Sequence, residues 1–289
     1  MESWYPSLGV IRKILKKIIL NFIFILSLFY SHNSKAQMIG QTPGLNPSMN
    51  IFSMNLHCFA GNWQFRFEQI LNKILELSPD VISLQEVCTT FNGNLNQIEF
   101  IKKYLMDRRY PLQKIVAQFT HPAWNQFNEY LVVITKQNVL AVDQGLLPTS
   151  ELQRGYIAIK LNPFWYINTH LEYKMENSAY RQMQIDFLIQ RFLNEAHVIG
   201  GDFNSAPDSQ EQFNFKRMSY LDFFPGNTFI GDDSNSSRRI DGMWFSPKAR
   251  MFLKTLNGGI TLDQKVNGQY LSDHFAIYSL LTFQLPYRR

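Results

Sequence analysis

The sequence predicts an α/β domain in which two β-sheets pack face to face and helices cover them. Three observations support this fold class. Short β-compatible runs alternate with helical runs near both ends of the chain, the middle is rich in strands joined by tight hairpins, and 45% hydrophobic residues, with 15% aromatic, can fill a sizeable core. Elements mixed in this way are typical of a sheet-on-sheet core with helical outer layers.

The individual elements follow from the spacing of apolar residues. Residues 65–77 and 178–193 place apolar side chains at helical spacing, and Pro79 breaks the first of these helices. The strand candidates are short and mostly apolar: in chain order, residues 50–56, 81–84, 130–135, 139–142, 156–161, 165–169, 198–200, 243–245 and 276–283.

Residues 1–36 predict a secretory signal peptide. Basic residues precede the apolar run 18–30, and Ser34 and Ala36 are the small residues that a signal peptidase reads. That run has 13 residues, whereas a membrane-spanning helix needs roughly 20. We therefore expect cleavage after Ala36 and a secreted or periplasmic protein. The alternative is an uncleaved N-terminal membrane anchor.

The rest of the chain predicts a flexible leader, residues 37–48, and one large domain, residues 49–286. Residues 1–36 hold five of the 28 Lys and Arg residues and one of the 23 Asp and Glu residues, so the remainder has 23 basic against 22 acidic side chains, a net charge of +1. This balance does not indicate a surface dominated by phosphate-backbone contacts, although a local basic patch stays open.

Polar or charged residues stand where several predicted strands end. They are Asn55, Glu86, His170, Asp202 and Asn204. Loops at strand ends present side chains while the sheet holds them still, so catalytic and binding groups gather there. The sequence therefore predicts a functional site at one edge of the sheets.

Six short motifs, in this order, resemble those of the endonuclease/exonuclease/phosphatase superfamily, which includes DNase I, AP endonucleases, neutral sphingomyelinases and deadenylases. They are Met54-Asn55-Leu56, Leu84-Gln85-Glu86-Val87, Asn168-Thr169-His170-Leu171-Glu172, Gly200-Gly201-Asp202-Phe203-Asn204-Ser205, Arg239-Ile240-Asp241-Gly242 and Ser272-Asp273-His274-Phe275. The resemblance covers residues 50–283. It implies a four-layered α/β sandwich, with two central mixed β-sheets flanked by helices, that hydrolyses phosphoric esters with a Mg²⁺-activated water.

The resemblance also implies a metal site. Glu86 would be the principal ligand, with Asn55 beside it and Asp273 nearby. Together with Asp202 and Asp241, this would gather four carboxylates in one pocket, and they cannot all stay ionised without a cation. A hard divalent ion with oxygen ligands suits such a pocket, which indicates Mg²⁺, with Mn²⁺ as the alternative.

The expected catalytic residues are His170, Asp202, Asn204, Asp241 and His274. Asp202 and Asn204 alternate around one residue and would point the same way on an extended segment, one toward the water and the other toward the phosphate. Asp241 would orient His274 and favour its charged form, and His170 would donate to the phosphoryl oxygens. Whether Asp202 or His274 is the general base stays open.

Asn55, Asn128, His170 and Asn204 are expected to contact the substrate. Asn128 aligns by spacing with a position that backs the first catalytic histidine or touches phosphate in relatives, and Glu129 lies one residue further on. By resemblance, Arg154, Arg181 and Gln184 are scaffold residues. Arg238 and Arg239 are either a solvated pair or contacts for a second phosphate, and His57, His121 and His197 receive no role.

Cys58 and Cys88 lie three and two residues beyond Asn55 and Glu86. An even number of cysteines in an exported chain permits one disulfide, which would brace the site if those two strand ends are neighbours. Two buried free thiols are the alternative.

The resulting functional hypothesis is a phosphodiesterase that acts on nucleic acid or on a phospholipid head group. For nucleic acid, the candidate contacts are the basic residues between Lys102 and Lys114, which could equally be a solvated helix face; for a lipid, they are the aromatic segments 121–124 and 223–229. The alternatives are a phosphomonoesterase of the same fold and a binding module that has lost catalysis. No feature predicts an obligatory protein partner, and a monomer is expected.

Overall fold

The computed structural model describes residues 48–123, 126–148, 151–222, 226–230 and 237–283. The expected signal peptide and nearly all of the expected leader lie outside these ranges, as do Trp124, Phe223 and Phe224. None of the described helices is long and apolar enough to span a membrane.

The first sheet has six strands in the order β10-β11-β1-β2-β4-β3. Strand β1 pairs in parallel with β2, and the other neighbours are antiparallel, so the sheet is mixed. Its strands are β1 (Ser48–Asn55), β2 (Val81–Thr90), β3 (Lys114–Ala123), β4 (Phe127–Thr135), β10 (Leu253–Thr261) and β11 (Ala276–Phe283).

The second sheet has five strands in the order β5-β6-β7-β8-β9. Only β7 and β8 are parallel, so this sheet is also mixed. Its strands are β5 (Ala141–Leu146), β6 (Gly155–Lys160), β7 (Trp165–His170), β8 (His197–Asp202) and β9 (Asp241–Phe245).

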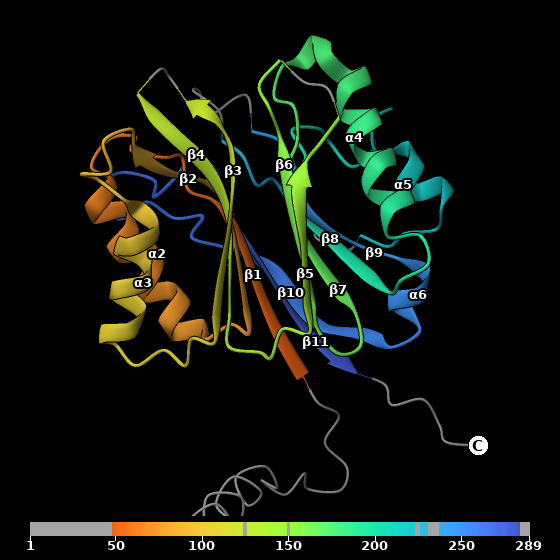
Figure 1. The fold of residues 1–289 in the computed structure, drawn as a ribbon, viewed down its shortest axis with the longest axis horizontal. Helices are drawn as coiled ribbons and strands as arrows, with labels where there is room; N and C mark the ends of the chain where they lie inside the picture. Colours follow the sequence, from red (N-terminus) through yellow and green to blue (C-terminus); the bar gives the residue numbers. More distant parts are fainter. Residues whose placement is uncertain (1–47, 124–125, 149–150, 223–225, 231–236, 284–289) are drawn as a thin grey trace, which may run out of the picture. The chain divides into compact units, whose positions relative to one another are not determined.

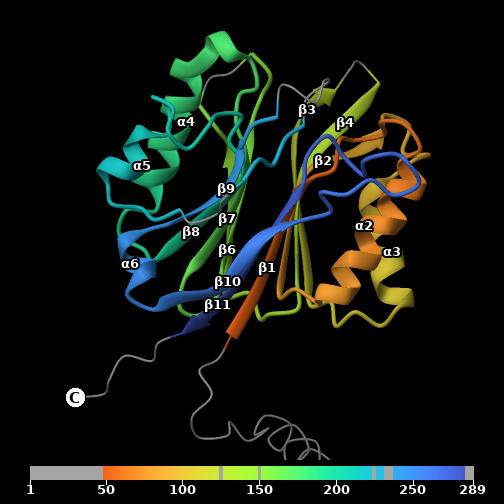
Figure 2. The same ribbon diagram turned by 180° about the vertical axis from the view of Figure 1, so that it is seen from behind.

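Helices cover the outer face of each sheet (Figures 1 and 2). Helices α2 (Trp63–Leu77) and α3 (Gln97–Asp107) pack on the first sheet, and α4 (Ser178–Arg191), α5 (Phe213–Arg217) and α6 (Pro247–Arg250) lie on the second, with the 3-10 turn η1 (Met175–Asn177) before α4. This helix–sheet–sheet–helix arrangement confirms the four-layered α/β sandwich expected from the sequence.

Alternation along the strands builds the layers. In β1, Ile51 packs between the two sheets, whereas its neighbour Phe52 packs against α2 and α3. In β8, Val198 likewise faces the first sheet and Ile199 faces α4. Because successive side chains on a strand point to opposite faces, strands buried on both faces read as continuous apolar runs.

The expected strands omit β3 and β10, which are the two edge strands of the first sheet. Several side chains of β3 are exposed or half-buried, so the strand has no continuous apolar run. Strand β10 carries Gly258 and Gly259 and a register shift between Thr255 and Asn257. An edge strand is covered less completely than a central strand, so its sequence carries a weaker signal.

Candidate active site

A cavity of about 440 Å³ opens at the edge of the two sheets where β1, β7 and β8 end. Residues from both sheets and from the loops beyond them line it. They are Glu86, His121, Pro122, Ala123, Glu129, Leu152, Arg154, His170, Tyr173, Asp202, Asn204, Phe229, Arg238, Asp273 and His274.

Strand register places three of the expected residues in one row. His170, the last residue of β7, is the Cα partner of Asp202 in β8, and Asp202 is in turn the partner of Asp241 in β9. Strands β7 and β8 are parallel and β9 is antiparallel to them, so the ends of two strands meet the beginning of a third. Residues far apart in the sequence therefore become lateral neighbours.

Asp202 lies at the centre of the site. Its Oδ2 accepts from Asn55 Nδ2 at 3.0 Å and lies 3.4 Å from His170 Nε2 and 3.6 Å from His274 Nε2. Its Oδ1 accepts from the backbone N–H of Asn204 at 2.8 Å. Asn204 lines the cavity as expected, but through a turn with φ 51° rather than an extended segment.

His274 is held against Asp241. Its Nδ1 lies 2.9 Å from Asp241 Oδ2, and both side chains are buried. Burial by itself opposes the charged imidazole, but Asp241 and Asp202 outweigh it and raise the pKa of His274 to about 10. His274 is therefore a cation at neutral pH.

His170 has the opposite character. Burial, followed by the neighbouring Arg154 guanidinium, lowers the pKa of His170 to about 3. Arg154 Nη1 lies 3.1 Å from His170 Nδ1, and since a guanidinium only donates, Nδ1 must accept. The proton of the neutral ring is therefore on Nε2, the nitrogen nearest Asp202. Arg154 also pairs with Glu129 at 3.2 Å.

A carboxylate corner lies beside Asp202. Asn55 Nδ2 bridges Asp202 and Glu86, donating to Glu86 Oε1 at 3.0 Å, while Asn55 Oδ1 accepts from the backbone N–H of His57. Asp273 lies 3.2 Å from His57 Nδ1. Burial, and then the nearby Glu129, raise the pKa of Glu86, with Asp273 adding to the effect.

Glu86 reaches this corner through a bulge in β2. Leu84 pairs with Val132 and Val87 with Tyr130, so two residues of β2 oppose the single residue Leu131. Glu86 adopts a left-handed φ of 51° there. For a residue other than glycine this conformation costs about 1–2 kcal/mol, and bulges beside active sites serve to re-aim a side chain.

The donors of the carboxylate corner fit a divalent cation. Glu86 and Asp273 offer oxygen ligands, and the raised pKa of Glu86 reflects buried negative charge that a cation would offset. Asp202, Asp241 and His274 also bring potential ligand atoms within 4.8 Å of one another. In this cluster His274 Nδ1 lies 2.9 Å from Asp241 Oδ2, so that nitrogen is already engaged in a hydrogen bond.

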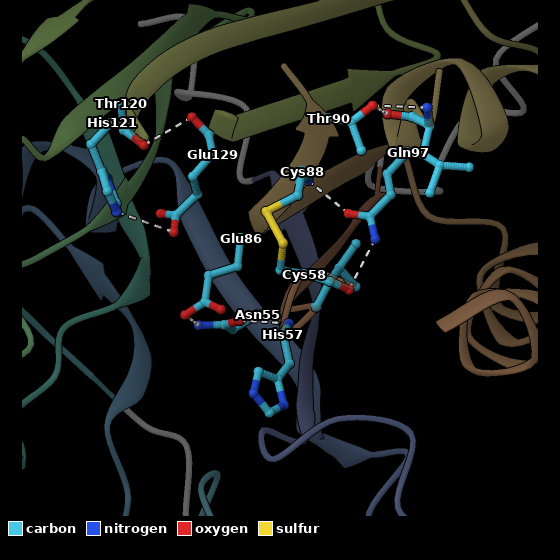
Figure 3. The surroundings of a disulfide bond; sticks show 12 residues. Asn55, His57, Cys58, Glu86, Cys88, Thr90, Gln97, Thr120, His121 and Glu129 are labelled. Atoms are coloured by element: carbon cyan, nitrogen blue, oxygen red, sulfur yellow. Dashed lines mark hydrogen bonds and ion pairs between the residues drawn. A yellow bond between two sulfur atoms is a disulfide. The ribbon is translucent and has the colours of Figure 1, made fainter. Parts of the chain in front are cut away.

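Cys58 and Cys88 form a disulfide, which Figure 3 shows between the segments that carry Asn55 and Glu86. The two Cα atoms lie 5.2 Å apart, within the usual range for a disulfide. Of the two alternatives that the sequence left open, the structure has the bridge.

The structure brings nearly all the expected site residues together. Six line the cavity, and Asn55 and Asp241 contact Asp202 and His274 directly. Asn128 is the exception. It precedes Glu129 on β4, and because neighbouring side chains on a strand face opposite ways, Glu129 lines the cavity and Asn128 does not.

Several cavity residues were not expected from the sequence. Glu129 lies 3.5 Å from both His121 Nε2 and His170 Nδ1, so it links a histidine that received no role to an expected catalytic one. Arg154, expected to be scaffold, joins the same group. Glu129 could have been noticed as a charged residue near the start of an otherwise apolar strand.

The two arginines before Asp241 have separate environments. Arg239 pairs with Asp222 and holds the loop. Arg238 lines the cavity, with its guanidinium 5.1 Å from the Phe229 ring centre. The basic residues of α3 do not line the cavity. Lys102 and Lys103 pair with Glu99 and Asp107 on the same helix, as in a solvated helix face.

Comparisons with known proteins agree with this architecture. The model of the Endonuclease/Exonuclease/phosphatase family matches residues 52–274. No curated protein matches the sequence significantly.

Solved structures show the same fold. An endonuclease/exonuclease/phosphatase family protein from Leptotrichia buccalis C-1013-b superposes with a TM-score of 0.68 at 18% identity, covering 82% of this chain and 100% of that one. D. rerio TDP2 complexed with a single-strand DNA product gives 0.64 at 18% identity, covering 82% and 100%. The human Nocturnin catalytic domain with a bound sulfate anion gives 0.62 at 18% identity, covering 83% and 96%.

Proposed function

The chain belongs to the endonuclease/exonuclease/phosphatase family, whose members hydrolyse phosphoric esters, and from that premise we propose that it is an exported, Mg²⁺-dependent phosphodiesterase. One observation carries the proposal. The buried rings of His170 and His274 approach one carboxylate oxygen of Asp202, with Nε2 at 3.4 and 3.6 Å, beside a carboxylate corner in a cavity of about 440 Å³. Hydrolysis of a phosphate ester needs a base, proton donors and charge relief, and this arrangement offers all three.

Asp202 is the group that we assign as general base. At neutral pH, His274 already carries protons on both ring nitrogens and cannot accept another. Asp202 would take a proton from the attacking water as its oxygen bonds to phosphorus and the P–O ester bond breaks. His274 would give a proton to the leaving oxygen, and the proton on Asp202 could return to His274 Nε2, 3.6 Å away.

His170 and Asn204 are assigned to the phosphoryl oxygens. The Nε2 proton of neutral His170 is a hydrogen-bond donor at the cavity, and Arg154 keeps the ring in this tautomer. Asn204 lines the cavity from the turn after β8, and its Nδ2, which donates one hydrogen to the carbonyl of Leu171 at 3.1 Å, has a second hydrogen to offer. Donors fixed before the reaction stabilise charge that develops in the transition state.

Glu86 and Asp273 would hold the metal ion, and Asn55 would fix the position of Glu86. When bound, a divalent ion supplies positive charge against the phosphoryl oxygens. We expect Glu86→Gln to weaken Mn²⁺ binding, measured by electron paramagnetic resonance of free Mn²⁺, by about 10-fold or more, because loss of a ligand should cost at least as much as loss of a residue that supports one. Asp241→Asn should leave Mn²⁺ binding unchanged; a larger loss in Asp241→Asn would move the metal to the Asp202–Asp241–His274 cluster.

Nucleic acid is the first candidate substrate, and a phospholipid head group is the second. The cavity rim carries Tyr173, which is 46% exposed and would stack on a base, and Arg238, which would meet a phosphate. The similar TDP2 structure contains a single-strand DNA product.

A substrate panel tests the activity. Plasmid DNA, single-stranded DNA, RNA, sphingomyelin and a phosphomonoester would each be incubated with Mg²⁺ and with EDTA. We expect metal-dependent cleavage of a diester. Cleavage of the monoester alone would favour the phosphomonoesterase, and no cleavage despite metal binding would favour the inactive module.

Export is part of the proposal. It is supported by the composition of residues 1–36 and by the disulfide, since such bonds persist in oxidising compartments. N-terminal sequencing of the secreted or periplasmic fraction would test it. A mature N-terminus at Gln37 is expected, and retention of residues 1–36 in the membrane fraction would instead support the anchor.

A further inference from the structure

The loop after β1 is held in an unusual backbone conformation. His57 and Cys58 have φ values of 54° and 42°, and Glu86 on the facing segment has 51°. All three lie in the left-handed region, which residues other than glycine rarely adopt. Such residues keep this conformation only where the surroundings over-determine it, so contacts around the loop must hold it.

Gln97 makes a second bridge beside the disulfide. Its Nε2 donates to the carbonyl of Cys58 at 2.9 Å, and its Oε1 accepts from the backbone N–H of Cys88 at 2.7 Å (Figure 3). The side chain is completely buried. The amide offers a donor and an acceptor on one terminal group, whereas an ionised glutamate accepts on both oxygens and could not make both contacts.

The bridged segments continue directly into the carboxylate corner. The backbone N–H of Cys58 donates to the carbonyl of Glu86 at 3.1 Å, and that of Leu56 donates to the carbonyl of Gln85 at 3.0 Å. Asn55 then reaches across to the Glu86 carboxylate. A displacement of Cys58 relative to Cys88 would therefore displace Asn55 relative to Glu86.

A separate set of contacts secures the loop to the rest of the fold. The Arg66 guanidinium donates to the carbonyls of Leu56, His57 and Cys58, and also to that of Leu271. These contacts do not involve Cys88, and they share only the carbonyl of Cys58 with Gln97. Loss of the bridges would therefore loosen the alignment of the two segments while Arg66 keeps the loop folded.

We propose that the Cys58–Cys88 disulfide and Gln97 act together as a clamp that positions Asn55 and Glu86 for divalent-metal binding. This inference rests on the proposed function, in which Glu86 is a metal ligand. Cys58, Cys88 and Gln97 are positioning residues, since none of them lines the cavity. Metal affinity would then depend on the oxidation state of the two sulfurs, and the site would be complete only in an oxidising compartment.

The test measures the Kd for Mn²⁺ by electron paramagnetic resonance for oxidised protein, reduced protein, the double variant Cys58→Ser/Cys88→Ser and Gln97→Glu. A phosphine reductant takes up the oxygen of one water molecule as the disulfide becomes two thiols, and it is removed before titration. We expect Kd to rise about 10-fold or more in the reduced and double-serine proteins, as for other residues that position metal ligands. Gln97→Glu should raise it severalfold.

Gln184 provides the matched control. It is equally buried, accepts from the backbone N–H of Glu172 at 3.0 Å and donates to the carbonyl of Pro148 at 3.4 Å. Gln184→Glu therefore introduces a similar defect away from the carboxylate corner. We expect it to lower the unfolding temperature like Gln97→Glu but to leave the Kd for Mn²⁺ unchanged.

The outcomes are distinguishable. Absence of Mn²⁺ binding by the oxidised protein would end the proposed metal site itself. Wild-type Kd in both the reduced protein and Gln97→Glu would overturn the clamp alone. An equal rise of Kd in Gln184→Glu would also overturn it, because metal affinity would then follow general stability. If the reduced protein unfolds, the comparison of the Kd for Mn²⁺ between Gln97→Glu and Gln184→Glu still tests the clamp.

Discussion

His170 and His274 lie on either side of one carboxylate oxygen, 3.4 and 3.6 Å from Asp202 Oδ2, and both are buried. At neutral pH they nevertheless differ in charge. The pKa of His170 is lowered to about 3, whereas that of His274 is raised to about 10.

The neighbours beyond Asp202 cause the difference. His274 has a second carboxylate, Asp241, at 2.9 Å, while the corresponding neighbour of His170 is the Arg154 guanidinium at 3.1 Å. Glu129, which could have charged His170, is paired with Arg154 instead. Burial makes both effects large, since the charge on a buried group is set by its immediate partners.

Removing the shared carboxylate should have the largest effect. We expect Asp202→Asn to lower kcat by about 10³-fold or more, because it removes the proposed base while keeping the side-chain shape. The measurement is steady-state kinetics on the diester found in the substrate panel, with Mn²⁺ binding and circular dichroism as controls for the metal site and the fold. A loss below 10-fold would show that another group is the base.

Breaking the His274 side should have the next largest effect. In Asp241→Asn the imidazole loses its principal charge partner, so we expect its pKa to fall and kcat to drop by about 10²-fold. In the wild type, activity should persist until pH approaches 10, and in the variant the alkaline limit should move to lower pH. If the pH at which activity falls on the alkaline side is the same in both proteins, the charge of His274 is not required for catalysis.

Breaking the His170 side should have a smaller catalytic effect. Arg154→Met removes the guanidinium that holds the neutral tautomer, so the pKa of His170 should rise, and kcat should fall about 10-fold. It also leaves Glu129 buried without its main partner, which should cost about 3 kcal/mol of folding free energy. Histidine titration by NMR and chemical denaturation measure the two effects. A His170 pKa that stays near 3 would assign its shift to burial alone.

The smallest effect concerns stability below neutral pH. Unfolded histidine titrates near pH 6.5, and folded His170 resists protonation down to about pH 3. As pH falls below 6.5, the unfolded state binds a proton that the folded state does not, so His170 destabilises the fold progressively. His274 has the opposite sign, since its contribution is complete below pH 6.5 and is lost as pH rises through about 10.

His170→Gln should therefore show a shallower fall in unfolding free energy between pH 6.5 and 5 than the wild type. Denaturant titrations at several pH values would measure this slope. Equal slopes in both proteins would contradict the lowered pKa of His170. His197, buried in contact with Tyr220, also has its pKa lowered, to about 4, so His197→Gln serves as the comparison for a histidine outside the cavity.

The central strands and the residues at their ends could be predicted from the sequence. Asp202 is the last residue of a fully buried strand, and Glu86 comes just after the apolar run at the start of β2, so a local pattern marked both. Asn128 and Glu129 show the limit of such patterns. The alternation of side chains along a strand shows which residues share a face, but it does not show which face lies toward the cavity. An alignment that is shifted by one residue therefore assigns the residue on the opposite face.

Other features of the site depend on contacts between distant segments. Arg154 meets Glu129 and His170 only because β4, β6 and β7 converge, and no local spacing encodes that meeting. His121 reaches the cavity from β3, an edge strand that the apolar pattern did not reveal. Arg238 and Arg239 are adjacent residues of the same type, so the sequence does not distinguish their roles. The ion pair of Arg239 with Asp222 distinguishes them in the structure.

The bulge in β2 lets Glu86 face the cavity without disturbing the pairing of the rest of the strand. Leu84 and Val87 both pack toward α2 and α3. In a regular strand, two residues that face the same side are separated by an even number of positions, but Leu84 and Val87 are three apart. The bulge at Gln85–Glu86 therefore contains one residue more than the pairing with β4 requires. Deleting Glu86 would restore a regular ladder opposite β4. Loss of this single codon could thus remove the proposed cation ligand while the protein still folds. Such a protein would keep the cavity for binding but lose the metal site proposed for catalysis.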